Sequence, residues 1–423
     1  MYVPLRVAAF TPGFALAFTL LLSAAQVHAA VATSARLKVF AATTQLRTHD
    51  IRRVAGGGAQ SRLQFDARGH VALTDEHWRA ELDGELTGSA ADRLRGVPGT
   101  VDPYGAHDGL RYFDFATVTA RSQERAVRGR IDRLLIGYRD AQFAFVVGRQ
   151  AVSWGNGLVF QPFDLFNPFA PVETDRDYKD GDDLALAQWT SADGRDVQLL
   201  AVARRAADGR RELAAGSVGA KWQQPLAAGE FALLVAQHAG DAVFGFGWNM
   251  PVGEAVVRAD WVVTRLDAHT WRHSAVINMD RSFVIDTRNV YGFVEIYRNG
   301  FGAAATPRDL SKLDPALQIR LQRGEVFTLS RWYGAVGATV EWNPLWKQTA
   351  LVIASAQDGS MLVQSTVRYE PGDRSVTEAG VTWGAGGSGD EFGGVPVLRT
   401  PPGVQAPTLG GGLTAHLRVA WYW

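Results

Sequence analysis

One segment of the chain combines regularly spaced aromatic rings with clustered acids, the residue types best suited to binding chemistry. Between Val159 and Asp183 the sequence reads VFQPFDLFNPFAPVETDRDYKDGDD. Clustered carboxylates can hold calcium, but these acids lack the alternating Asp-x-Asp-x-Asp-Gly order of a calcium loop, so we expect no metal. The residues that we assign to a binding or constricting surface are Phe160, Phe163, Phe166, Phe169, Asp175, Asp177 and Asp180.

Catalytic motifs are scarce elsewhere in the chain. A hydrolase built on a serine needs a histidine and an acid within mutual reach. None of the nine His residues accompanies a Gly-x-Ser-x-Gly elbow, and His273 and His416 have no evident partner in the sequence. The absence of Cys excludes disulfides, thiolate metal sites and c-type haem attachment. We therefore expect neither enzymatic activity nor a cofactor.

Outside this segment, polar residues alternate with apolar ones along short stretches. In GLTAHLRVAWYW, every second residue from Leu413 to Trp423 is apolar and most of those between are polar. A period of two is typical of a β-strand with one apolar and one polar face. The pattern recurs around residues 254–264, 333–342 and 363–370. The polar positions that we assign to a lumen are Glu254, Arg258, Asp260, Glu341, Arg368, Glu370, His416 and Arg418.

The aromatic residues favour a transmembrane antiparallel β-barrel over a soluble two-sheet sandwich. The strands of both folds alternate apolar and polar residues, but only the membrane barrel needs aromatic side chains at both ends of its strands. The chain has 13 Trp, and Trp421 and Trp423 end the last strand, where we expect them to be the signal for the barrel-assembly machinery. After the N-terminus, no stretch offers about 18 consecutive apolar residues, so any membrane crossing must use strands.

The N-terminus has the composition of a cleaved export signal. Residues 1–30 combine Arg6, an apolar run and small residues before a cleavage position. Residues 31–423 are then expected to form one all-β outer-membrane barrel. Counting its short and long connections gives about 18 strands, within a range of about 16 to 20. The long external loops are expected near 89–125, 154–182, 300–324 and 385–410.

Two stretches leave the strand assignment open. In QFAFVVGRQ, the apolar Phe143 and Phe145 share a face with Arg149. Either a bulge switches the faces near Gly148, or the interior is partly apolar. Residues 110–120 either belong to a long external excursion or form a further wall strand, which would break the alternation of connections.

The motif GRQAVSWGNG at 148–157, followed by FQPFDLFNP and the aromatic C-terminus, resembles bacterial outer-membrane barrels of the alginate-export and related porin-like families. Those families share Gly-Arg-Gln followed by Trp or Tyr and Gly on one strand. The resemblance implies a barrel of similar size in the outer membrane of a Gram-negative bacterium. It also places Arg149, Gln150 and Trp154 in the lumen or at its rim.

These features favour a channel for polar or carbohydrate-like solutes, because a wall of about 16 to 18 strands encloses an aqueous bore. The Phe-rich segment either folds into the mouth and constricts it or forms a rigid external lid. The alternatives are a polysaccharide export conduit and a structural or adhesive barrel that binds a partner through its loops. We expect the lipid bilayer, the assembly machinery and a small polar solute or saccharide as partners. Nucleic acid is not expected, since 43 cations balance 43 acids.

Overall fold

The computed structural model describes most of the chain. The described residues are 30–55, 57–92, 108–122, 124–166, 178–206, 208–266, 270–305, 309–398, 400–401 and 403–423. The expected export signal, apart from Ala30, lies outside them, as do the predicted site residues Phe169, Asp175 and Asp177.

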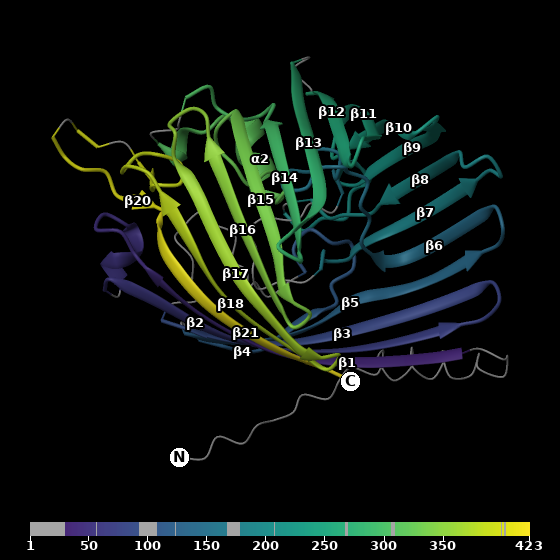
Figure 1. Ribbon diagram of the computed structural model, residues 1–423, viewed down its shortest axis with the longest axis horizontal. Helices are drawn as coiled ribbons and strands as arrows, with labels where there is room; N and C mark the ends of the chain where they lie inside the picture. The colour runs from purple at the N-terminus through teal and green to yellow at the C-terminus, as the bar shows by residue number, and fades with distance from the viewer. Residues whose placement is uncertain are drawn as a thin grey trace.

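The chain forms a closed antiparallel β-barrel (Figure 1). Its main sheet has 19 strands and closes because β1 pairs with both β2 and β21. The closed wall has 18 strands, which confirms the predicted fold class. The wall strands are β1 (Ala30–Gln45), β2 (Ala59–Thr74), β3 (Trp78–Ala91), β5 (Arg125–Arg139), β6 (Phe143–Gln150), β7 (Asp182–Thr190), β8 (Asp196–Val202), β9 (Ser217–Leu226), β10 (Gly229–His238), β11 (Asp241–Val252), β12 (Ala255–Arg265), β13 (Trp271–Ile285), β14 (Arg288–Arg298), β15 (Trp332–Asn343), β16 (Trp346–Ser355), β17 (Met361–Gly372), β18 (Ser375–Ala385) and β21 (Gly412–Tyr422).

Shorter elements lie in the connections. Strand β4 (Ala116–Arg121) pairs with residues 126–130 of β5, whereas β6 pairs with residues 134–139 farther along β5. β4 therefore extends the sheet beyond the end of β6 and does not cross the wall, so the alternation of connections is kept. The other elements are η1 (Ile51–Ala55), η2 (Leu213–Ala215), η3 (Leu310–Lys312), α2 (Pro315–Gln322), β19 (Val395–Pro396) and β20 (Thr408–Leu409).

The connections at the two ends of the barrel differ in length. The end that holds the C-terminus has short turns at 75–77, 140–142, 191–195, 227–228, 253–254, 286–287, 344–345 and 373–374. The opposite end has the long connections 46–58, 92–115, 151–181, 203–216, 299–331 and 386–411. Gathering of long connections on one rim is typical of the extracellular side of outer-membrane barrels. Among the described residues, no helix is long and apolar enough to cross a membrane.

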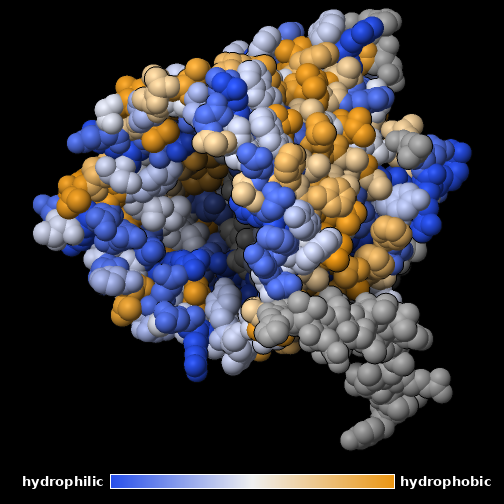
Figure 2. Space-filling model, turned by 90° about the vertical axis from the view of Figure 1, so that its right-hand side faces the viewer, coloured by the Kyte–Doolittle hydropathy of each residue, from blue (hydrophilic) through white to orange (hydrophobic). Residues whose placement is uncertain are grey.

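The strands direct apolar side chains outward and many polar ones inward. On β21, Leu413, Leu417 and Trp421 are exposed, while His416 and Arg418 are buried. Figure 2 shows a hollow bordered mainly by hydrophilic residues, with apolar residues gathered on the flank beside it. The alternation in the sequence thus corresponds to an apolar outer surface and a polar lumen.

A local change of faces explains the irregular pattern of β6. Phe143, Phe145 and Val147 are exposed on its outer surface, but Arg149 is only 1% exposed and lies inside. The faces switch at Gly148, whose φ of 130° is rarely adopted by residues with a side chain. The sequence therefore alternates imperfectly here because the backbone turns, and the interior at this point is polar.

Strand β5 contains a bulge that also changes which residues face the lumen. Its register with β3 pairs Asp83 with Arg133 and Gly84 with Ile131, which leaves Asp132 as the extra residue. Asp132 is buried and forms ion pairs with Arg133 at 2.8 Å and with Arg68 of β2 at 2.9 Å. Because of the bulge, the consecutive residues Asp132 and Arg133 both face the lumen side, where Asp132 accepts a hydrogen bond from the amide of Gly181 and Arg133 donates to the carbonyl oxygen of Lys179.

Replacing Gly148 with Ala should destabilise the barrel. A Cβ at this position would lie 2.1 Å from the carbonyl oxygen of Leu134, and a strained φ alone costs about 1 to 3 kcal/mol. The measurement is the urea concentration at which the folded, heat-modifiable band disappears in lipid. Gly84→Ala is the matched control, because nothing lies within 4 Å of its added Cβ. Equal unfolding midpoints would show that Gly148 does not carry the change of faces.

Candidate functional site: a segment folded into the barrel

The connection between β6 and β7 enters the barrel. We call its described residues, 151–166 and 178–181, the inner segment. Its Trp154, Phe163 and Phe166 are at most 6% exposed. An external lid would not bury these rings against the lumen side of the wall, yet they pack on Leu184, Leu200, Val202, Leu234, Val243 and Val262.

Glycines in the wall make room for two of these rings. A Cβ on Gly245 of β11 would lie 2.6 Å from the Phe163 ring, and one on Gly219 of β9 would lie 3.1 Å from the Phe166 ring. In packing as close as this, the addition of even one methyl group would disturb the contact. The wall is therefore shaped to receive the inner segment.

Phe160 extends the contact to β14 and β15. Its ring stacks on Tyr297 at 4.4 Å between centroids and lies 5.6 Å from the ring of Tyr333. Aromatic pairs of this geometry contribute about 0.5 to 1.5 kcal/mol beyond the area that they bury. Val159 joins the same buried cluster. The inner segment thus follows the wall from its exit at β6 as far as β15.

Buried carboxylates of the wall bind the backbone of the inner segment. Glu295 of β14 accepts hydrogen bonds from the amide nitrogens of Leu158 at 2.6 Å, Val159 at 3.0 Å and Phe160 at 2.8 Å. Asp260 of β12 accepts two from Asn156, through its backbone and its side chain, each at 2.7 Å.

Asn278 of β13 completes this arrangement. Its Nδ2 donates to the carbonyl oxygen of Asn156 at 3.1 Å and to Glu295 at 3.2 Å. We call Asp260, Asn278 and Glu295 the wall clamp; each is at most 2% exposed. Backbone groups that leave a sheet for a buried position need such partners, and charged acceptors give the stronger bonds.

The returning part of the inner segment reaches the opposite side of the barrel. The ring of Tyr178 lies 4.8 Å from the guanidinium carbon of Arg36 on β1 and 4.3 Å from that of Arg68 on β2. Asp180 pairs with Arg130 of β5 at 2.7 Å. The inner segment therefore contacts β14 and β15 at one point and β1 and β2 at another, so it extends across the lumen.

Among the described residues of this stretch, most of the acids are buried. Asp164 is buried, accepts a hydrogen bond from the amide of Gly155 at 2.8 Å and pairs with Lys179. Asp182 and Asp183, at the start of β7, are also buried. These buried acids pair with nearby cations and accept hydrogen bonds from backbone amides, because burial without a partner is costly for a charge.

Arg149 is a structural centre of this network. Its guanidinium donates to both oxygens of Asp183, at 2.9 and 3.0 Å, and to the carbonyl oxygen of Phe113 at 2.7 Å. It also bonds to Asp108, from the excursion before β4. Arg149 thus ties three parts of the chain together beneath the surface of the lumen.

The neighbouring predicted residues are likewise buried. Trp154 donates from Nε1 to Gln198 of β8 at 2.7 Å. The Nε2 of Gln150 lies 3.5 Å from the carbonyl oxygen of Val146. Both residues support the point at which the chain turns inward.

Most of the predicted wall charges are paired. Arg258 bonds to Asp280, and Arg418 pairs with Glu378 at 2.6 Å. His416 is buried and stacks on Phe40. Glu254 is different: it lies in the turn 253–254 and pairs with Arg281. Of the remaining residues assigned to the lumen, Arg368 pairs with Glu370 at 2.6 Å and Glu341 pairs with Lys347 at 3.3 Å.

Neutral polar side chains also face the lumen, but the assignment from the sequence followed the charged residues and left them out. Thr44 and Thr414 bond at 2.9 Å between β1 and β21, and Gln364 bonds to Thr382 at 3.3 Å between β17 and β18. These positions alternate with outward apolar residues, so the period of two could have identified them. They give this side of the barrel hydroxyl and amide groups beside its paired charges.

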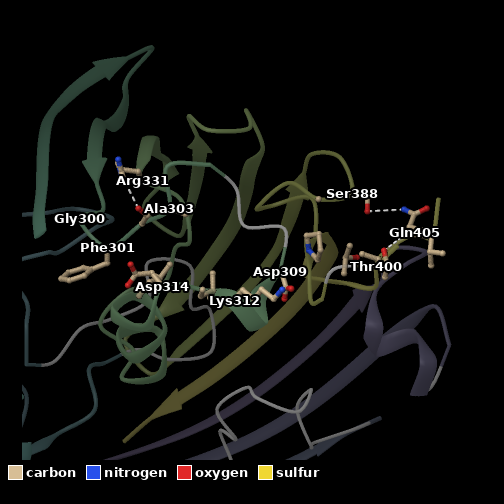
Figure 3. Close-up of a pocket in the computed structure, with 18 of the residues that line it drawn as sticks. Gly300, Phe301, Ala303, Asp309, Lys312, Asp314, Arg331, Ser388, Thr400 and Gln405 are labelled. Carbon is tan, nitrogen blue, oxygen red and sulfur yellow. Dashed lines mark hydrogen bonds between the residues drawn. The ribbon is translucent and has the colours of Figure 1, made fainter. Parts of the chain in front are cut away.

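A cavity opens at the mouth, between the connections 299–331 and 386–411. Its volume is about 850 Å³. Figure 3 shows Asp309, Lys312 and Arg331 on one side, with Ser388, Thr400 and Gln405 on the other. Such a mixed lining suits solutes that carry hydroxyl and charged groups.

A group of ligand-type side chains lies on β2 and β3. His70, Glu81 and Asp83 bring one ligand atom each to within 4.8 Å of one another. Asp83 also pairs with Arg68 at 2.5 Å, and Glu81 with Arg79 at 2.5 Å. These arginines already satisfy one oxygen of each carboxylate, and the predicted absence of a metal stays a prediction.

A serine, a histidine and an acid do meet at the rim, which the sequence did not reveal. Ser217 Oγ lies 2.9 Å from Nδ1 of His238, and Nε2 of His238 lies 2.9 Å from Glu325. Ser217 is only 6% exposed, and its Oγ also accepts from the amide of Ala239 at 3.3 Å. This geometry fastens the connection 299–331 to β9 and β10 and leaves the hydroxyl enclosed.

Comparison with known proteins identifies the architecture. No family model matches the chain, and no curated protein matches it. The solved structure of OccAB1 from Acinetobacter baumannii superimposes with a TM-score of 0.53 at 8% identity, covering 93% of this chain and 96% of that one. The chain has the porin fold.

Two further structures support the same fold. The outer membrane protein OpdK of Pseudomonas aeruginosa gives a TM-score of 0.52 at 10% identity, and a BenF-like porin of Pseudomonas fluorescens Pf-5 gives 0.55 at 9%. Each match covers 93% of this chain and 98% of the other. The resemblance to porin-like barrels is confirmed, but nothing supports the alginate-export type specifically.

Replacing Glu295 with Gln should loosen the inner segment, because the amide group offers one acceptor oxygen where the carboxylate offers two. Losing a buried acceptor costs about 1 to 3 kcal/mol, which corresponds to roughly tenfold faster exchange of the amide hydrogens at 156–160. Hydrogen exchange read by mass spectrometry measures this. Glu341→Gln is the control, since Glu341 bonds to Lys347 and Asn289 and not to the inner segment. Unchanged exchange in Glu295→Gln would refute the clamp.

Acid should release the connection 299–331 from the rim. Burial raises the pKa of Glu325, but the hydrogen bond and charge of His238 and the charges of Arg320 and Arg323 outweigh it, so the pKa lies below its ordinary 4.5. A depressed pKa stabilises the attachment at neutral pH, and this contribution is lost as pH falls through that lower value. Limited proteolysis at pH 7 and pH 3.5 should show faster cleavage in acid. Glu325→Gln should remove most of the difference, and an unchanged difference would contradict this assignment.

Proposed function

We propose that the protein is an outer-membrane channel through which polar solutes pass, constricted by the inner segment. The observation that carries this proposal is the path of the segment, which is bound to Glu295 on one side of the lumen and to Arg36 and Arg68 on the other. A fixed segment across a polar bore narrows the passage and leaves it wet. The porin fold supports a location in the outer membrane of a Gram-negative bacterium.

We assign the solutes to small, hydroxyl-bearing molecules such as saccharides. The charges on the lumen wall are largely paired with one another, whereas Thr44, Thr414, Gln364 and Thr382 offer neutral hydrogen-bonding groups. The mouth cavity adds Ser388 and Thr400 to this lining. An export conduit for polysaccharide and an adhesive barrel remain the alternatives; both would use the long connections.

A hydrolase is not proposed. The chain Ser217–His238–Glu325 has the residue types of a catalytic triad, but the serine is 6% exposed and already engaged. A nucleophile must reach a substrate carbonyl.

Assembly of the barrel through the C-terminal aromatic residues Trp421 and Trp423 is part of the proposal.

Deleting Phe160 to Asp180 should increase the single-channel conductance and let larger sugars enter proteoliposomes in a swelling assay, because it removes the constriction. Deletion of residues 208–210, in another connection at the same rim, is the control and should change neither quantity. If the first deletion leaves both quantities unchanged in a folded barrel, the inner segment does not limit passage.

A further inference from the structure

The lumen side of β9 carries a buried lysine at the edge of the inner segment that faces the short turns. Lys221 is only 8% exposed, and its Nζ lies 5.9 Å from the centre of the Trp154 ring. Among the described residues, its ammonium group has no hydrogen-bond acceptor and no ion-pair partner. Lys221 is therefore a donor that the fold itself does not use.

The strand register places two acids beside this lysine. On β9, Lys221 and Gln223 are two residues apart on one face, about 7 Å along the strand. Gln223 lies opposite Asp196 of β8 and bonds to Glu230 of β10 at 2.7 Å. Asp196 is thus the diagonal neighbour of Lys221, within reach of a long side chain, and the charges of both acids act on Lys221. Strands β8 to β10, which lie side by side in Figure 1, bring a cation and two acids together in the lumen.

Amide side chains, and not cations, satisfy these two acids. Asp196 accepts hydrogen bonds from Gln188 at 2.5 Å and from Gln198 at 2.8 Å. Glu230 accepts one from Asn249 at 2.6 Å. In the part of the chain that the structure describes, neither acid forms an ion pair. A carboxylate offers about four acceptor positions, so both acids can accept further hydrogen bonds from a solute.

This combination of groups favours a hydroxyl as the ligand. A hydroxyl oxygen can accept a hydrogen bond from Lys221 while its proton is donated to Asp196 or Glu230. A carboxylate on the solute would be repelled by the two acids, and an amine would be repelled by the lysine. A buried lysine without a partner is costly in a membrane protein, and a sugar hydroxyl supplies the acceptor that it lacks.

We propose that Asp196, Lys221 and Glu230 form a binding site for a neutral saccharide beside the constriction, which we call the inner subsite. Lys221 determines its specificity, because the flexible stem of a lysine lets the ammonium group follow a hydroxyl. Glu230 and Asn249 are partly exposed, so the inner subsite opens to the lumen. This inference rests on the proposed channel function and specifies the solute that the channel holds during passage.

The test is the block of single-channel current by maltotriose, a neutral trisaccharide, with the full-length protein in a planar bilayer. Lys221→Met should raise the half-blocking concentration about tenfold or more, because a charge-assisted hydrogen bond is lost. Lys347→Met is the matched control and should leave this concentration unchanged, since Lys347 faces the lumen from β16 but pairs with Glu341 at 3.3 Å. If Lys221→Met does not fold, Lys221→Gln replaces it.

Trigalacturonate, a linear trisaccharide that carries carboxylates, provides the second arm. It should block the wild-type channel at least about tenfold more weakly than maltotriose, because the acids of the inner subsite repel it. Absence of block by maltotriose, equal block by the two sugars, or an equal effect of both lysine variants would overturn the inner subsite. Steady current steps without sugar report the channel itself, so failure of the inner subsite is distinguishable from failure of the channel function.

Discussion

A peptide backbone that leaves a β-sheet for the inside of a barrel must find new partners for its N–H groups, and the rest of this structure depends on that constraint. Glu295 supplies them for three successive residues and Asp260 for Asn156. The rings of Phe160, Phe163 and Phe166 then add apolar contacts with the wall. The inner segment is thereby held as part of the barrel interior.

The lumen into which the inner segment folds has two kinds of surface. Around β1 to β7 the inward side is dense in ion pairs, with Arg149, Asp183 and Arg130 among them. Buried pairs of this sort add little net stability, but removing one partner leaves a costly charge, so they define a single arrangement. On β17, β18 and β21, Gln364, Thr382 and Thr414 add neutral groups beside paired charges, and a polar solute meets groups there that bind it weakly and reversibly.

The sequence predicted the strands, whose pattern is local, but it did not predict the contacts between residues that are far apart in the chain. The period of two identified β21 and the wall as a whole, because consecutive residues of a strand point to opposite faces of the sheet. The clamp joins residues 137 positions apart and has no local signal. Alternation alone did not place Asp132 or Arg149, since a bulge and the turn at Gly148 change the faces locally, and Arg149 was assigned to the lumen or its rim only through the resemblance.

The partners of the acids in and next to the inner segment could not be predicted from the residues around them. Asp164, Asp182 and Asp183 are buried against cations that come from the inner segment, the connection 203–216 and β6, respectively. The meeting of Ser217, His238 and Glu325 likewise depends on a long connection that folds back to the rim. Pairing between distant parts of the chain decides both, and only the closed barrel reveals it.

The most direct test of a constricted channel is the single-channel current of the refolded wild-type protein in a planar bilayer, with ion selectivity read from a salt gradient. The structure predicts steady current steps with weak selectivity between cations and anions, since the lumen charges are largely paired. A folded, heat-modifiable barrel that passes no current would contradict the channel and favour a closed or adhesive barrel.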